Sequence, residues 1–179
     1  MNRLRLTPKG LLFQGRTLPC VVGRGGVRVD KREGDGATPA GIHHVVGCLY
    51  RPDRVSKPNR WAEQILPGDL WSDDENDSDY NHLVRAPYTP SHEVLRRADP
   101  MYDVVLVLDW NWPNAVPCLG SAIFIHQWRR QGFPTAGCLA LARGDLLWLA
   151  RHMQFGAQID VSAIRLPSVC KTYGNLPDA

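Results

Sequence analysis

A cysteine and a histidine are the residues of this chain best suited to catalysis. Cys138 ends the segment Phe133-Pro134-Thr135-Ala136-Gly137-Cys138, and His126 lies twelve positions earlier. A thiol becomes a nucleophile when a nearby base accepts its proton, and imidazole is a common base. Residues 127–134 can fold back as a loop and bring the two side chains together. The pair predicts acyl transfer through a thioester, with Cys138 as nucleophile and His126 as general base and acid.

The backbone around the cysteine supports this interpretation. Gly137 permits a sharp turn, so N–H groups of Gly137 and Cys138 can point at one oxyanion. A helix is expected at 145–154, and a helix N-terminus close to Cys138 would favour the thiolate. Taken singly, Cys138 is better explained as an inert core residue and His126 as a packed histidine at a strand end. The prediction therefore depends on their occurrence together with the glycine and the helix.

Short strands dominate the rest of the chain. The apolar run at 103–109 predicts a strand buried on both faces, and 121–126 a second one ending at His126. Strands are also expected at 11–13, 17–22, 42–50 and 159–164, and a short helix capped by Ser91 is expected through Arg97. The sequence predicts one mostly β domain over residues 1–179, with a short helix after the nucleophile.

Composition excludes several classes of protein. The net charge is +3, and Lys and Arg are scattered, so nucleic-acid binding is not indicated. The five cysteines are Cys20, Cys48, Cys118, Cys138 and Cys170, and none forms a CxxC pair. The acidic segment 73–79 lacks the Gly and Glu of a calcium loop, so no metal or cofactor is expected. We also expect no transmembrane helix, and residues 1–10 lack the apolar region of a signal peptide.

These residues resemble the YkuD-type L,D-transpeptidases, which carry a histidine, a variable loop and then Ser/Thr-x-Gly-Cys. That pattern is His126, the loop and Thr135-Ala136-Gly137-Cys138 here. Further blocks, in the order of the family's compact proteobacterial branch, extend the resemblance over roughly Gly23 to Ala150. They are Lys31–Gly41 with Thr38-Pro39-Ala40-Gly41, Trp71-Ser72-Asp73-Asp74, Tyr80-Asn81, Gly120–His126 and Ala142-Arg143-Gly144-Asp145-Leu146.

The resemblance implies a β-sandwich-like fold and an enzyme of cell-wall peptidoglycan. Cys138 would attack a diaminopimelate-containing stem peptide, and Gly137 would contribute a backbone oxyanion donor. Expected substrate contacts come from the motif and from polar and aromatic residues near it, namely Thr135, Arg143, Tyr80, Asn81 and Trp110. For Tyr80, Asn81 and Trp110 the alternative is simple packing, and for Arg143 it is an exposed residue without a role.

Three positions depart from the pattern of the family. Ala136 stands where many relatives have histidine, Ala140 where many have Arg or Asn, and Cys118 where this branch usually has glycine. These departures leave the substrate specificity open.

The resemblance leaves three functions open, which are a transpeptidase, an L,D-carboxypeptidase or endopeptidase with the same thiol chemistry, and a non-catalytic cell-wall binding module. It also implies a periplasmic location, although no leader is visible, as well as a monomer and covalent inhibition by carbapenems.

Overall fold

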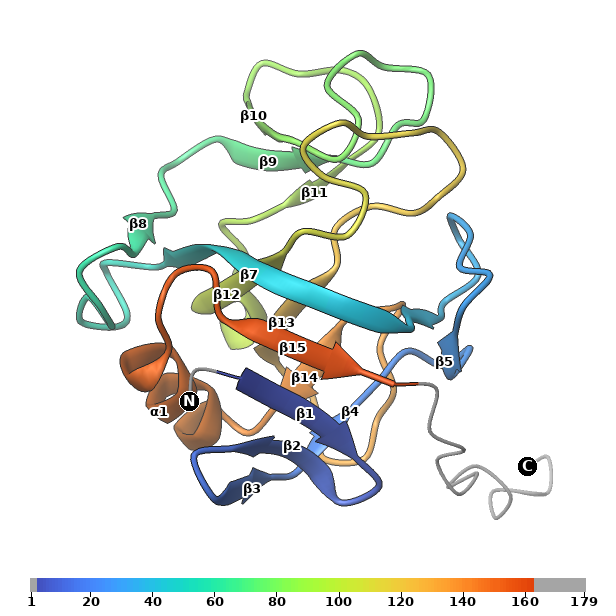
Figure 1. The fold of residues 1–179 in the computed structure, drawn as a ribbon. Coiled ribbons are helices and arrows are strands. Elements are labelled where there is room, and N and C mark those ends of the chain that lie inside the picture. The colour runs from blue at the N-terminus through green and yellow to red at the C-terminus, as the bar shows by residue number, and fades with distance from the viewer. Residues whose placement is uncertain (1–2, 163–179) are drawn as a thin grey trace, which may run out of the picture.

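A ten-stranded sheet forms the frame of the protein (Figure 1). The computed structural model describes residues 3–162, and the strand order is β3-β2-β1-β15-β7-β12-β13-β14-β4, with β8 beside β7. The strands are β1 (Arg3–Thr7), β2 (Gly10–Phe13), β3 (Arg16–Leu18), β4 (Cys20–Val21), β7 (Gly41–Tyr50), β8 (Glu63–Gln64), β12 (Val104–Leu108), β13 (Phe124–Gln127), β14 (Leu139–Leu141) and β15 (Gln158–Val161).

Two hydrophobic cores lie on opposite faces of the central strands. In β12, Val104, Leu106 and Leu108 enter the first core, whereas Val105 and Val107 enter the second. This alternation confirms the prediction of a strand buried on both faces. The first core also takes in the strands β1 and β2 and the only α-helix of the described residues, and the second holds Trp71, Tyr102, Phe124 and Cys138.

A small sheet lies beside the second core (Figure 1). It has the order β10 (Leu83–Arg85), β9 (Asp69–Ser72), β11 (His92–Val94). The predicted helix from Ser91 to Arg97 is therefore wrong. A segment this short gains little as an isolated helix, whereas antiparallel pairing of β11 with β9 satisfies its backbone. A further two-stranded sheet pairs β5 (Val27–Arg28) in parallel with β6 (Thr38–Pro39).

The helix α1 (Arg143–His152) follows the nucleophile, as predicted, but begins two residues early. Leu146, Leu149 and Ala150 are its buried residues. β14 separates Cys138 from α1, which corrects the expectation that the helix dipole acts on the thiol. The dipole effect fades within one helical turn, so it cannot favour a thiolate across an intervening strand.

The other predicted elements are present with shifted ends. Residues 11–13 and 16–18 form the expected hairpin, and β7 covers 42–50. The single strand expected at 17–22 is wrong, because β3 ends at Leu18, before Pro19, and β4 pairs with β14 instead of β2. The strand expected at 121–126 begins only at Phe124, because Ala122 has a positive φ of 52° and leaves the extended conformation. The strand expected at 159–164 corresponds to β15, which ends at Val161. Residues 163–164 lie outside the described part of the chain. A mostly β fold with a short helix after the nucleophile is confirmed.

A short 3₁₀ helix, η1 (Pro100–Tyr102), carries Tyr102 into the second core. Within residues 3–162 no helix has the length and apolar character needed to cross a membrane.

Candidate active site

The turn before Cys138 is held by its own threonine. Thr135 Oγ1 donates to the Cys138 carbonyl at 2.5 Å and accepts the Gly137 N–H at 3.1 Å. Gly137 has φ of 150°, and a Cβ there would lie 3.0 Å from the Ala37 carbonyl oxygen. Glycine is required here both by conformation and by space. Thr135, expected as a substrate contact, thus shapes the turn of the nucleophile.

An early segment of the chain supports this turn from outside. The buried Thr38 hydroxyl donates to the Gly137 carbonyl at 2.7 Å and accepts the Gly23 N–H at 2.9 Å. Gly23 also forms an isolated parallel bridge with Thr135. The glycine-rich residues 23–26 and the Thr-Pro-Ala-Gly block therefore hold the nucleophile turn, and sequence reasoning did not assign them that task.

The Cys138 thiol lies in a cradle of backbone groups. Its Sγ donates to the Ala122 carbonyl at 3.1 Å and accepts the Phe124 N–H at 3.3 Å. The residue is only 9% exposed. Burial raises the pKa of the thiol to about 12, and the Phe124 N–H partly opposes this rise. The resting group is a protonated thiol, not the thiolate expected from the sequence.

His126 lies on the strand next to the nucleophile. β13 and β14 are parallel, with Ile125 opposite Leu139 and His126 opposite Ala140. Because strand residues alternate between faces, His126 projects on the same face of β13 as Phe124. Cys138 lies in the bend directly before β14, and it shares the second core with Phe124 and with Tyr102, against which His126 packs. The structure thus brings both predicted catalytic residues beside the same core.

Hydrogen bonding defines the protonation of the imidazole. The His126 Nδ1 lies 2.8 Å from the Gln127 carbonyl oxygen, which can only accept, so Nδ1 carries the proton and Nε2 keeps its lone pair. Burial lowers the pKa of His126 to about 4. The ring packs edge-on against Tyr102, with centroids 5.3 Å apart. The neutral ring keeps Nε2 available to accept a proton, but a pKa this low makes it a weak base in the resting state.

A carboxylate and a tyrosine form a pair that sequence reasoning missed. The Tyr102 hydroxyl donates to Glu93 Oε2 at 2.5 Å. Burial raises the pKa of Glu93, and the charge of Glu93 in turn raises the pKa of the Cys138 thiol. Both residues lie in segments without a recognisable motif, so no local signal could have found them.

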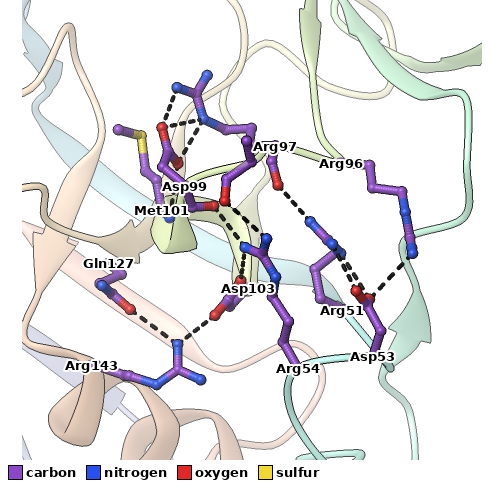
Figure 2. A network of polar contacts seen from close by, with 11 residues as sticks. Arg51, Asp53, Arg54, Arg96, Arg97, Asp99, Met101, Asp103, Gln127 and Arg143 are labelled. Atoms are coloured by element: carbon purple, nitrogen blue, oxygen red, sulfur yellow. Dashed lines mark hydrogen bonds and ion pairs between the residues drawn. The ribbon is translucent and has the colours of Figure 1, made fainter.

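Arg143 belongs to a polar network that joins it to Asp103 and the Gln127 side chain (Figure 2). Its Nη1 donates to Asp103 Oδ2 at 2.5 Å and weakly, at 3.4 Å, to the Gln127 side chain. Arg54 donates to the other oxygen of Asp103 at 3.0 Å. The side chain of Arg143 is 42% exposed, so the guanidinium still faces solvent. It lies at the far end of β14 from the thiol.

Tyr80, Asn81 and Trp110 are engaged with the protein itself. The Tyr80 hydroxyl donates to Glu33 at 2.6 Å, and the Trp110 indole N–H donates to the Leu119 carbonyl at 2.8 Å. Trp110 packs against the first core, on the face away from Cys138. Asn81 is 2% exposed and bonded on both its oxygen and its nitrogen. Of the three, only Asn81 is connected to the thiol cradle, through Ala122.

The exposed Cys118 thiol donates to Glu75 Oε2 at 3.0 Å. Across the described residues, histidine, cysteine and carboxylate side chains nowhere gather in threes as a metal site would require.

Comparison with known protein families identifies the class of this domain. The model of YkuD, the L,D-transpeptidase catalytic domain, matches residues 3–161. The chain therefore belongs to the YkuD family. This membership implies a cysteine-dependent enzyme of the L,D-transpeptidase type that acts on peptidoglycan peptides outside the cytoplasm. Searches of curated proteins and of solved structures give no match.

Proposed function

We propose that this protein forms cross-links between peptidoglycan stem peptides through a thioester on Cys138. The observation that carries the proposal is the placement of Cys138, in the bend before β14, and His126, on the neighbouring strand β13, beside the same core, with Nε2 of a neutral imidazole free to accept a proton. Family membership supports the substrate class.

In the first half of the reaction the Cys138 sulfur attacks the acyl carbon of a diaminopimelate-containing stem peptide. The thiol proton passes to His126 Nε2, so a neutral pair becomes an imidazolium and an oxyanion. When the intermediate collapses, the C–N bond breaks and His126 returns the proton to the leaving amine. No hydrogen bond joins the two side chains among the described residues, and such contacts often tighten only when substrate binds.

In the second half, an amine of another stem peptide attacks the thioester and gives its proton to His126. The C–S bond breaks, and the departing sulfur takes that proton back. Water in place of the amine gives a carboxypeptidase or endopeptidase, which is the second candidate because the thiol and imidazole chemistry is identical.

The oxyanion needs backbone donors at the nucleophile turn. The Gly137 N–H already donates to Thr135 Oγ1, so it can serve only by giving up that bond. We assign the Cys138 N–H as the principal donor and Gly137 as the residue that permits the turn. Arg143, with its solvent-facing guanidinium, is proposed to contact a substrate carboxylate.

The proposal extends to where and how the enzyme acts. We further propose that the enzyme acts in the periplasm as a monomer of one catalytic domain, and that carbapenems acylate it at Cys138.

The test incubates purified protein with muropeptides that carry tetrapeptide stems, beside the Cys138→Ala variant. Cross-linked dimers that disappear in the variant support the transpeptidase. Trimmed monomers without dimers support the hydrolase instead. Binding without turnover in both proteins would leave only a cell-wall binding module.

A further inference from the structure

Asn81 lies beneath the thiol cradle and not in an open cleft. Its Oδ1 accepts two N–H donors, from the Ala122 backbone at 2.9 Å and from the Trp71 indole at 3.0 Å. Its Nδ2 donates to the carbonyls of Trp110 at 3.1 Å and Asn111 at 2.7 Å. All four hydrogen-bonding positions of the amide are occupied, which also assigns the orientation of the amide.

Each of the two donors to Asn81 Oδ1 is connected to one of the two groups that contact the Cys138 sulfur, the Ala122 carbonyl and the Phe124 N–H. Ala122 supplies the carbonyl that accepts the Cys138 S–H. Trp71 packs edge-on against Phe124 with centroids 5.0 Å apart, and Phe124 supplies the N–H on Sγ. One side-chain oxygen thus connects to both halves of the cradle.

The backbone at both ends of this connection is unusual. Ala122 has φ of 52° and Asn81 has φ of 60°, in the left-handed region that L-residues rarely adopt. An alanine has no side-chain means of stabilising that conformation, whereas asparagine tolerates it. The bond from the Ala122 N–H to Asn81 therefore helps to keep the Ala122 carbonyl aimed at the thiol.

We infer that Asn81 is a positioning residue that orients the Cys138 sulfur through the Ala122 carbonyl. This inference rests on the proposed function for its effect on turnover, but its effect on the thiol itself can be measured separately. Without Asn81 the Ala122 carbonyl turns away and water reaches the sulfur. Both changes favour the thiolate, while the Phe124 N–H stays in place through the pairing of β13 with β12.

The test uses Asn81→Gly in the full chain, because glycine keeps the positive φ while it removes the whole side chain, the amide included. Alkylation by iodoacetamide is followed across pH by mass spectrometry at Cys138 and, in the same sample, at the buried Cys48. We expect Cys138 to react several-fold faster near pH 8 with Cys48 unchanged. The transpeptidase kcat should fall by about tenfold to a hundredfold, as expected for a misplaced nucleophile, with KM changed less than about threefold.

Two further variants keep the inference falsifiable. Asn81→Asp retains an oxygen for the Ala122 and Trp71 donors, so Cys138 should react no faster than in the wild type. Asn59→Ala is the matched control, because Asn59 also bridges two backbone groups but lies beside Cys48, far from the cradle. It should leave Cys138 reactivity unchanged.

The outcomes separate the inference from the proposed function. The positioning role would be overturned if the alkylation rate of Cys138 across pH were unaltered in Asn81→Gly. It would also be overturned if Cys138 reacted as fast in Asn81→Asp as in Asn81→Gly. A shifted profile in Asn81→Gly alone supports it, even if the wild-type protein forms no cross-links and the proposed function fails.

Discussion

The buried imidazole of His126 makes the stability of this protein depend on pH in a calculable way. The side chain is buried, and its pKa falls from the ordinary 6.5 to about 4 in the folded state. Between these two values the unfolded chain binds a proton that the folded chain does not. Stability must therefore decrease as the pH is lowered through this window.

The size of the effect follows from the shift. One pKa unit corresponds to about 1.4 kcal/mol, so the complete shift is linked to about 3 kcal/mol. Integration from about pH 7 to about pH 4.5 gives a loss of about 2 kcal/mol from this residue alone. That is a large part of the stability of an ordinary domain.

The assay compares urea unfolding of the wild type and His126→Gln at the two pH values. The variant lacks the titrating ring, so its unfolding free energy should fall by about 2 kcal/mol less than that of the wild type. Other buried groups, His43 among them, titrate in both proteins and cancel. His152→Gln is the matched control, since this exposed ring also bonds a backbone carbonyl, and it should keep the wild-type dependence.

If the decrease in unfolding free energy between the two pH values agreed within about 0.5 kcal/mol for the wild type and His126→Gln, a buried neutral imidazole would be refuted. The same result would remove the argument that His126 rests as a free base, because a solvated ring would not be held in that form. An NMR titration gives a second check, since the His126 ring should show no inflection above about pH 5.

Two further predictions concern the support of the nucleophile. Thr38→Val keeps the shape but leaves a buried carbonyl and a buried N–H without partners, so stability should fall by about 2–4 kcal/mol and Tm by about 5–15 °C in calorimetry. Thr17→Val, at an exposed strand position, should change Tm little, and equal losses would contradict the bridging role. Glu93→Gln removes a charge that raises the Cys138 pKa, so alkylation of that thiol near pH 8 should become several-fold faster. The exposed Glu63→Gln is its control, and an unchanged rate in Glu93→Gln would contradict the coupling.

Local sequence patterns were sufficient for the elements that depend on their own residues. The apolar run 104–108 could only be a strand buried on both faces, and the spacing of Leu146, Leu149 and Ala150 indicated a helix. The residues Leu139, Ala140 and Leu141 also form an apolar run, and they were a signal of β14. Without a strand at 139–141, the helix would begin close to Cys138. The expectation that a helix dipole acts on this thiol is therefore wrong.

Contacts between distant segments set the limit of prediction. Ser91 is a good cap for a helix, but pairing of the following residues with β9 outweighed that local preference. The bond of Thr38 to Gly137 joins residues 99 positions apart, and nothing near Thr38 in sequence reveals its partner. The motif at Cys138 indicated the residue that we propose as nucleophile, but only the folded chain shows the groups that position it.

The arrangement of these groups explains why one short motif is a weak indication of function. The nucleophile turn receives its shape from Thr135, its outer support from Thr38, and its sulfur cradle from the stretch Ala122–Phe124. Three separate segments must meet before the Cys138 sulfur has a fixed position. A Gly-Cys pair without them would place a thiol on a mobile turn, at a cost of orders of magnitude in rate when the reacting atoms are misplaced. The ordered upstream blocks are thus part of the catalytic apparatus that we propose, because they determine where the nucleophile lies.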